Sequence, residues 1–295
     1  MSVAFCGLSL AHPVINGSGT FDALAARRAF GAALGERFPF AAYVSKTITL
    51  APRPGNPPPR LWESAGGLIN SIGLPNKGLD GYLAEDLPQI TGFRSDPAAG
   101  ESMAVPVITN VMGATAEELA SLVEACEARP EIAAIELNVS CPNVATGLDI
   151  GADPAELERV VGAVRPRTGK PLIVKLTPNA ADVAACALGA EAGGADAVSL
   201  INTLRAAALD PGAHGPRMWL GGGTGGLSGA AVRPVALAQV AAVAAKVRIP
   251  VVGMGGVQRS EHARELLEVG ASLVAVGTES FRDPAAGTRI AAGLS

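Results

Sequence analysis

The chain contains 295 residues, of which 48% are hydrophobic and 17% charged, so it has enough apolar material for a large core and is not a disordered polymer. Its formal net charge of −4, from 23 basic and 27 acidic residues with no basic run, disfavours nucleic acid binding. The N-terminus lacks a signal-peptide pattern and no apolar stretch reaches the ~18 to 20 residues of a membrane span, so we expect a soluble, cytoplasmic protein.

Short runs rich in Val and Ile alternate with Ala-rich segments of helical length, which is typical of βα units around a parallel sheet. The candidate strands are residues 14–16, 42–46, 68–71, 105–110, 134–138, 172–176, 197–201, 250–253 and 273–277. Helices are predicted between them at residues 116–128, 153–164, 180–192, 231–247 and 260–269, and Pro154 suits the first helical position of the second.

A closed barrel needs eight strands, one fewer than the candidates. The run at residues 68–71 is short and follows two glycines, so we assign it to an excursion. The remaining strands predict a single domain over residues 1–295, an α/β fold of the (β/α)8 TIM barrel type. Long inserts are expected after strand 2 (residues 47–104) and strand 6 (residues 202–229), and inserts of that length usually carry function.

Polar residues follow the predicted strands at their carboxyl ends. They are Asn16, Lys46, Asn110, Asn138, Lys175 and Asn202. A lone Asn at such a position is usually a turn residue. In a barrel, however, all these ends meet at one mouth, so several amide and amine groups together predict a site.

Glycines follow the last two predicted strands, at Gly255, Gly256 and Gly277. Glycine allows backbone N–H groups to approach a phosphate closely, and the loops after strands 7 and 8 of barrels commonly form such a site. The sequence therefore predicts a phosphorylated ligand.

Lys46 and Lys175 end apolar strands, where a lysine requires an anion or a polar acceptor. Cys141 lies on a predicted turn, whereas Cys126 and Cys186 lie in predicted helices and are interpreted as small core residues. The four cysteines contain no Cys-x-x-Cys pair, so neither a disulfide framework nor a metal or iron–sulfur site is predicted. Cys141 is therefore the candidate reactive thiol.

Several motifs at these positions together resemble the dihydroorotate dehydrogenase family, and the likeness spans nearly the whole chain. They are residues 45–47 (SKT), 55–60 (GNPPPR), 70–76 (NSIGLPN), 136–143 (ELNVSCPN), 174–179 (VKLTPN) and 253–257 (GMGGV). Cysteine rather than serine at position 141 resembles class 1, the soluble enzymes. Residues 224–237 with 249–256 resemble the class 1B, NAD-dependent catalytic subunit.

The resemblance implies oxidation of (S)-dihydroorotate to orotate in pyrimidine (UMP) biosynthesis. One FMN per chain would take a hydride from C6 while Cys141 removes a proton from C5. The substrate-binding residues implied are Lys46, Asn70, Ile72, Gly73, Leu74, Asn138, Asn143, Asn202 and Thr203. The FMN-binding residues implied are Ser18, Gly19, Lys46, Thr47, Asn110, Asn138, Lys175, Ile201, Gly226, Leu227, Gly255, Gly256, Gly277 and Thr278.

The resemblance also implies partners. Electrons would pass to NAD through a separate subunit that carries FAD and a two-iron, two-sulfur (2Fe-2S) cluster, because the cysteines of this chain lack the spacing for such a cluster. A homodimer within a heterotetramer is expected. Residues 144–153 are expected to form a lid that excludes water.

Other functions remain open at this point. The nearest is the fumarate-dependent class 1A enzyme. A dihydropyrimidine dehydrogenase-like flavin barrel is another, although those proteins usually carry His where this chain has Asn143. A non-redox phosphate-binding barrel could use Lys46 or Lys175 as a Schiff base or acid–base group. A catalytically silent binding barrel would keep the glycine loops but has no use for Cys141.

Overall fold

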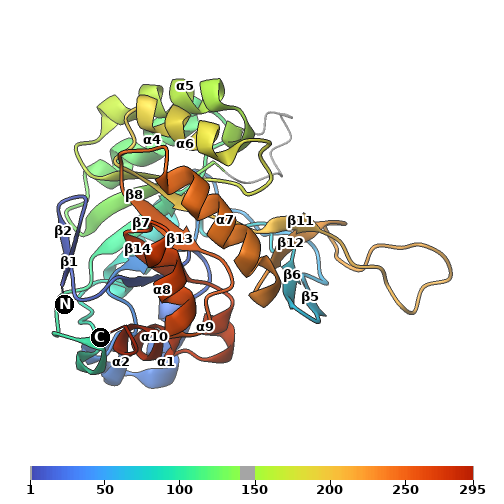
Figure 1. Ribbon diagram of the computed structural model, residues 1–295, viewed down its shortest axis with the longest axis horizontal. Coiled ribbons are helices and arrows are strands. Elements are labelled where there is room, and N and C mark those ends of the chain that lie inside the picture. The colour runs from blue at the N-terminus through green and yellow to red at the C-terminus, as the bar shows by residue number, and fades with distance from the viewer. Residues whose placement is uncertain (1, 140–149, 295) are drawn as a thin grey trace.

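The computed structural model describes residues 2–139 and 150–294 (Figure 1). Eight parallel strands form one sheet in the order β3-β14-β13-β10-β9-β8-β7-β4, so neighbours in the chain are neighbours in space. They are β3 (Val14–Asn16), β4 (Tyr43–Val44), β7 (Val107–Val111), β8 (Ile132–Asn138), β9 (Leu172–Lys175), β10 (Ala197–Leu200), β13 (Val251–Met254) and β14 (Leu273–Val276). Each overlaps one of the eight predicted runs, and the predicted (β/α)8 barrel is confirmed.

A side chain closes the barrel between β3 and β4. The Nδ2 of Asn16 donates to the carbonyl of Val44 and its Oδ1 accepts from the N–H of Val44, both over 2.8 Å. Beside them, the N–H of Ala41 donates to the carbonyl of Val14 over 3.0 Å. Asn16 is fully buried. Its amide therefore supplies hydrogen bonds that the two-residue strand β4 cannot make through the backbone alone.

Replacing Asn16 with leucine should destabilise the fold by about 2 to 4 kcal/mol, because the N–H and the carbonyl of Val44 would both be buried without partners. Urea unfolding at equilibrium measures this free energy. Gln89→Leu, at an exposed amide, is the matched control and should change it by less than ~0.5 kcal/mol. Equal losses in the two variants would show that the barrel closes without this side chain.

Helices cover the outside of the barrel (Figure 1). They are α1 (Ala23–Phe30), α2 (Ala32–Glu36), α4 (Ala116–Glu127), α5 (Pro154–Val164), α6 (Val183–Ala192), α7 (Arg233–Ala244), α8 (Ser260–Glu268), α9 (Glu279–Arg282) and α10 (Ala286–Ala292). The five predicted helices are confirmed, with Pro154 at the first position of α5. The prediction placed the start of α6 at residue 180, which is wrong, because the Asp182 side chain caps the helix by accepting from the N–H groups of Ala184 and Ala185.

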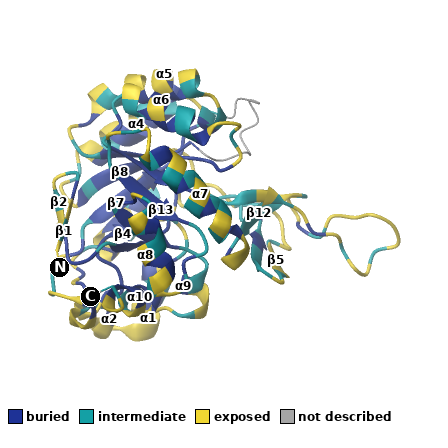
Figure 2. Cartoon of the chain, in the orientation of Figure 1, coloured by how far each residue is buried: buried dark blue, intermediate teal, exposed yellow. Residues whose placement is uncertain are grey.

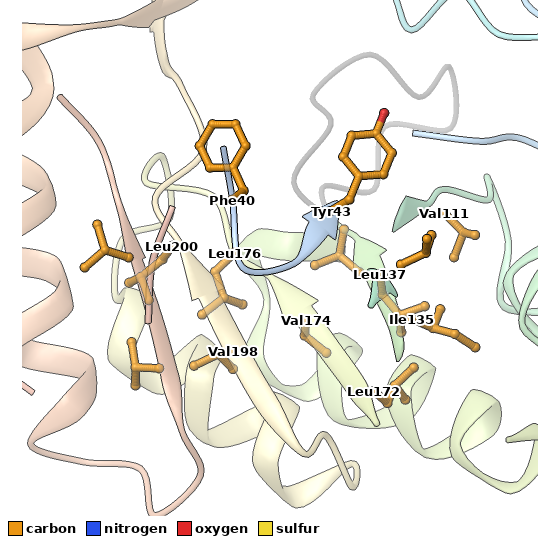
Figure 3. Packing of buried hydrophobic residues seen from close by; sticks show 14 of the residues in the cluster. Phe40, Tyr43, Val111, Ile135, Leu137, Leu172, Val174, Leu176, Val198 and Leu200 are labelled. Carbon is orange, nitrogen blue, oxygen red and sulfur yellow. The ribbon is translucent and has the colours of Figure 1, made fainter. Parts of the chain in front are cut away.

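Side chains on the two faces of each strand enter different cores, as the alternation of a strand requires. Those facing outward, such as Ile135, Val174 and Leu200, pack beneath the helices (Figure 3). Those facing inward, such as Ile108 and Ile173, fill the barrel interior. Apolar packing on both faces explains why the strands are nearly continuous apolar runs.

An N-terminal hairpin that was not predicted covers the amino ends of the barrel strands. It consists of β1 (Val3–Phe5) and β2 (Leu8–Leu10), and its buried Phe5 and Leu10 pack in the same cluster as the inward-facing barrel residues. The turn holds Cys6 at φ 47° and Gly7 at φ 81°. One end of the barrel is thus closed, which leaves the carboxyl ends of the strands as the open mouth.

The two inserts meet in a second sheet that extends from the barrel (Figures 1 and 2). Its antiparallel order is β11-β12-β6-β5, with β5 (Leu61–Ser64) and β6 (Gly67–Asn70) from the first insert and β11 (Leu204–Ala206) and β12 (Gly225–Ser228) from the second. The assignment of residues 68–71 to an excursion is confirmed, because β6 lies in this sheet.

The first insert also carries α3 (Gly78–Gly81) and a short π-helical turn (Tyr82–Asp86). Short 3-10 helices occur at Leu87–Gln89, Pro97–Ala99, Ile150–Ala152, Arg165–Arg167 and Ala230–Val232. No helix in the described part of the chain is long and apolar enough to cross a membrane.

Candidate active site

A buried polar layer lies above the apolar filling of the barrel. Four of its members follow inward-facing apolar residues by two positions in β7, β8, β9 and β10, and Asn138 follows Glu136 by two, so all of them point into the same interior. They are Asn110, Glu136, Asn138, Lys175 and Ser199, and each is at most 6% exposed.

Hydrogen bonds tie this layer together across four elements. Glu136 accepts from Asn110 Nδ2 over 2.5 Å and from Ser199 Oγ over 2.7 Å. Asn138 Nδ2 donates to Thr47 Oγ1 over 3.2 Å. The remaining oxygen of the Asn110 amide, Oδ1, is buried and has no partner among the described residues. Buried acceptors are normally paired, so this oxygen is suited to a ligand that donates a hydrogen bond.

Lys175 is the buried cation of the layer, at 6% exposure, and its register neighbours are Asn138 and Ser199. Within the described residues it makes no ion pair with a carboxylate. Lys46 follows β4 between the buried Ser45 and Thr47 and is itself exposed. Both predicted lysines thus lie at carboxyl ends of strands, one inside the barrel and one open to solvent.

The loops after β13 and β14 provide backbone donors. The N–H groups of Gly256, Gly277 and Thr278 have no acceptor in the described part of the chain, whereas Gly255 follows the last paired residue of β13, Met254, which is the register neighbour of Ala275. Gly256 has φ 69°, and a Cβ there would lie 2.8 Å from the carbonyl oxygen of Gly229, so only glycine fits. A cavity of about 430 Å³ is lined by Gly256 and Thr278 together with residues 63–68. These features fit an anion such as a phosphate.

The insert sheet brings the predicted substrate residues toward each other. Asn70 Nδ2 donates to the carbonyl of Gly226 over 3.2 Å, which joins the first insert to the second. The backbone N–H groups of Gly73 and Leu74, just beyond β6, have no acceptor among the residues described. Thr203 packs so closely on Gly226 that a Cβ there would lie 1.9 Å from Thr203 Oγ1.

Replacing Gly226 with alanine should lower kcat/KM by about 100-fold, because the added methyl group displaces Thr203 and a misplacement of ~1 Å has that cost. Steady-state kinetics measures the effect. Gly162→Ala is the control, since a Cβ there meets no atom within 4 Å. If Gly226→Ala kept the activity of Gly162→Ala, the contact between Gly226 and Thr203 would not shape the site.

Other predicted residues have structural partners. Ser18 Oγ donates to the carbonyl of Ser45 and Thr278 Oγ1 to Ser228 Oγ, both over 2.8 Å. The N–H of Ile201 donates to the carbonyl of Met254 over 2.9 Å. Three more predicted residues lie next to Ser18, Ile201 and Ser228 in the chain: Gly19 after β3, Asn202 after β10 and Leu227 in β12.

Cys141, Asn143 and most of the predicted lid lie outside the described residues. The other cysteines are poor reactive thiols. Burial raises the pKa of Cys6 to about 11, and it raises the pKa of Cys126 to about 12. Cys186 is fully buried in α6. Cys141, the remaining cysteine of the sequence, stays a prediction as the reactive thiol.

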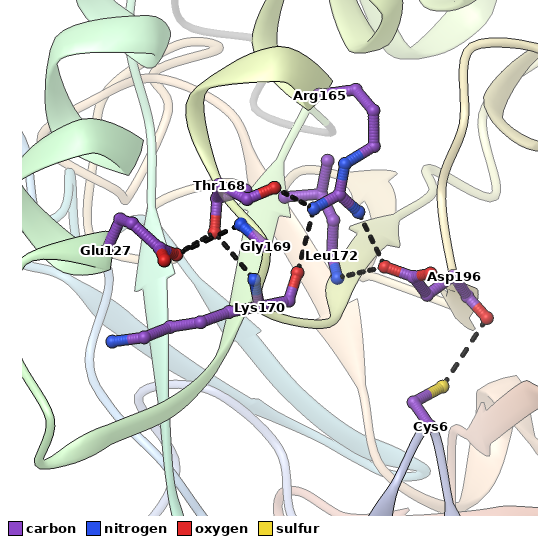
Figure 4. A network of polar contacts seen from close by, with 8 residues as sticks. All are labelled: Cys6, Glu127, Arg165, Thr168, Gly169, Lys170, Leu172 and Asp196. Carbon is purple, nitrogen blue, oxygen red and sulfur yellow. Dashed lines mark hydrogen bonds and ion pairs between the residues drawn. The ribbon is translucent and has the colours of Figure 1, made fainter.

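The opposite end of the barrel carries charged residues that are already paired (Figure 4). Arg165 contacts Asp196 over 2.6 Å and donates to the carbonyl of Lys170, and Asp196 also accepts from the N–H of Leu172. A depression of about 540 Å³ lies here. These polar groups bind each other across the segments that precede β9 and β10. We therefore assign them a role in stabilising the barrel and not in binding a ligand.

Sequence reasoning missed Ser199 and left the role of Glu136 open. The signal for Ser199 was available: it follows the inward-facing Ala197 by two residues in a predicted strand, as Asn110 follows Ile108. Glu136 faces the interior together with Asn138, two residues further on, because the β8 to β9 register runs unbroken from Ile135 to Asn138.

The residues present fit FMN, which joins a phosphate to a ring system rich in hydrogen-bonding groups. The phosphate suits the free N–H groups after β13 and β14, and the ring suits the unpartnered Asn110 Oδ1 and the buried Lys175. Fold and site together define a (β/α)8 barrel with buried polar residues at the carboxyl ends of its strands and glycine-containing loops that suit a phosphate.

Comparisons with known proteins specify the family. The family model for dihydroorotate dehydrogenase matches residues 1–295. The catalytic subunit of dihydroorotate dehydrogenase B (NAD(+)) from Pelobacter propionicus is 43% identical over 298 residues, covering 100% of this chain and 92% of the relative. Its counterpart from Geobacter sulfurreducens is 42% identical over 300 residues, covering 99% of this chain and 91% of the relative. This chain belongs to the dihydroorotate dehydrogenase family, as its motifs predicted.

Proposed function

We propose that this chain oxidises dihydroorotate to orotate in pyrimidine biosynthesis, as the FMN-containing catalytic subunit of an NAD-linked enzyme. The observation that carries the proposal is the buried layer of Asn110, Glu136, Asn138 and Lys175 beside the free N–H groups after β13 and β14, in a chain of this family. The relatives' printed names, which specify NAD(+) and a catalytic subunit, support the subclass.

The cofactor would be held by the residues that the resemblance implied. Gly255, Gly256, Gly277 and Thr278 would surround the phosphate of FMN, with the free N–H groups of Gly256, Gly277 and Thr278 as its donors. Lys175 and Asn110 would bind the ring. When bound, FMN supplies the acceptor for a hydride from the substrate.

The substrate would be recognised mainly by amide groups. Asn70, Asn138, Asn143 and Asn202 each offer both a donor and an acceptor, which suits a pyrimidine edge. The N–H groups of Gly73 and Leu74, with Lys46 and Thr203, would add donors toward the substrate's carboxylate. Four amides and one ammonium would favour a pyrimidine that carries a carboxylate.

Cys141 would act as the base. The C5–H bond of dihydroorotate breaks with its proton moving to the Cys141 sulfur, the C6–H bond breaks with its electron pair leaving as hydride, and the C5=C6 double bond of orotate forms. The base must hold that proton away from the departing hydride and release it to solvent afterwards.

The two electrons would leave through a partner subunit. The relatives are named as catalytic subunits, which implies a second subunit in those proteins. We propose that the partner of this chain carries FAD and a 2Fe-2S cluster and delivers the electrons to NAD, and that two catalytic chains form a dimer within the complex.

Orotate formation by the FMN-loaded chain tests the proposal. With an artificial electron acceptor, dihydroorotate should be oxidised and dihydrouracil should not, because only dihydroorotate carries the carboxylate. Oxidation of dihydrouracil alone would favour a dihydropyrimidine dehydrogenase-like barrel. Turnover with fumarate as acceptor would favour class 1A and overturn the NAD-linked assignment.

A further inference from the structure

Two side chains of opposite charge are buried in the barrel interior, Glu136 at 4% and Lys175 at 6% exposure. Across residues 2–139 and 150–294, no other Asp, Glu, Lys or Arg side chain is buried. The two lie on the neighbouring strands β8 and β9, and Ser199 connects them, since it is the register neighbour of Lys175 and donates to Glu136. They form no ion pair, because no N–O distance between them is within 4.0 Å.

Glu136 is instead held by two neutral donors, Asn110 Nδ2 and Ser199 Oγ. A carboxylate that is buried without a cation lowers stability unless other interactions offset the loss of water. Fold stability alone therefore does not account for a carboxylate at this position.

The hydrogen bond to Glu136 fixes the side chain of Asn110. An ionised carboxylate only accepts, so Asn110 must turn its NH2 group toward Glu136. Its Oδ1 is then left over, and this is the buried atom without a partner among the described residues. The hydrogen bond to Glu136 therefore fixes which end of the Asn110 amide presents its oxygen as a free acceptor.

We propose that Glu136 is a positioning residue of the flavin site: it holds Asn110 with the amide oxygen free to accept from the cofactor, and its charge opposes that of Lys175. This inference rests on the proposed binding of FMN. The two buried charges act in opposite directions on the flavin, since Lys175 favours the reduced, more negative form and Glu136 disfavours it. Glu136 thereby limits how oxidising the bound flavin is.

Glu136→Gln keeps the shape of the side chain but removes its charge. The Asn110 amide could then face the glutamine with either its NH2 group or its oxygen. We expect the midpoint potential of the bound flavin, measured by dye-linked reductive titration, to become more positive. The expected size is about tenfold in the preference for reduced over oxidised FMN, or about 30 mV for a two-electron couple. An unchanged or more negative potential would overturn the proposal.

Ser199→Ala is the matched variant, because it removes the other donor to the carboxylate and leaves the charge. Its potential should be unchanged or more negative, since the carboxylate is then less neutralised. A shift to more positive potential would mean that any disturbance of this layer has the same effect, and would overturn the proposal even if Glu136→Gln failed to fold.

A double-mutant cycle tests whether Glu136 acts through Asn110. Glu136→Gln should weaken the binding of oxidised FMN about tenfold, as measured by quenching of FMN fluorescence, and should have no such effect in an Asn110→Ala background. Equal effects in both backgrounds would refute positioning through Asn110. Failure of the wild-type chain to bind FMN would refute the proposed function itself. If the wild-type chain binds FMN and the variants match it in FMN binding and flavin potential, only this inference is refuted.

Discussion

Replacing Cys141 with alanine should lower kcat by about 10²- to 10⁴-fold while FMN stays bound, because the proposed general base is lost and the proposed FMN contacts do not include this thiol. Steady-state turnover and the flavin absorption spectrum of the same preparation measure the two effects. The activity of the unaltered chain should also rise with pH toward the ordinary thiol pKa of about 8.5, since the base that we propose is a thiolate.

Cys126→Ala is the control for Cys141, because Cys126 is fully buried in α4 and burial raises its pKa to about 12. It should retain the turnover and pH profile of the unaltered chain. Comparable turnover in Cys141→Ala, or a flat profile from about pH 6 to 9 with chemistry limiting the rate, would remove Cys141 from the mechanism.

Replacing Lys175 with methionine should weaken FMN binding by about 10- to 100-fold, which corresponds to the loss of a charge-assisted hydrogen bond. Methionine fills the same buried space without the charge, and no carboxylate among the described residues would be left unpaired by the change. The dissociation constant follows from fluorescence quenching of added FMN. The flavin potential should also become more negative.

Lys246→Met, at an exposed position just after α7, is the matched control and should leave both quantities unchanged. If Lys175→Met bound FMN as tightly as Lys246→Met, the buried ammonium would have another purpose. The flavin would then be held mainly by the loops after β13 and β14.

The sequence predicted the barrel well because its strands are buried on both faces. Each run had to be apolar throughout and bounded by turn residues, and all eight were found for that reason. The hairpin of β1 and β2 escaped prediction because each of its strands has only three residues and is buried at a single position. The hydrogen bonds by which Asn16 closes the barrel were not predicted either, since they depend on Val44, 28 residues away.

The site was predictable where position along a strand determines it. Asn110, Asn138 and Lys175 lie at or next to the carboxyl ends of barrel strands, so topology alone brings them to one mouth. The pairing of β6 with β12 joins segments that lie more than 150 residues apart, and no local pattern encodes it. The role of Glu136 could not be assigned from the sequence, because it depends on the contacts of both its oxygens. One oxygen accepts from Asn110 on β7 and the other from Ser199 on β10.

Anaerobic titration of the FMN-loaded chain with dihydroorotate tests the central claim most directly. One equivalent of dihydroorotate should bleach the flavin absorption band near about 450 nm and release one equivalent of orotate, with no other protein present. A flavin that binds but does not bleach, or a chain that binds no flavin, would contradict the account.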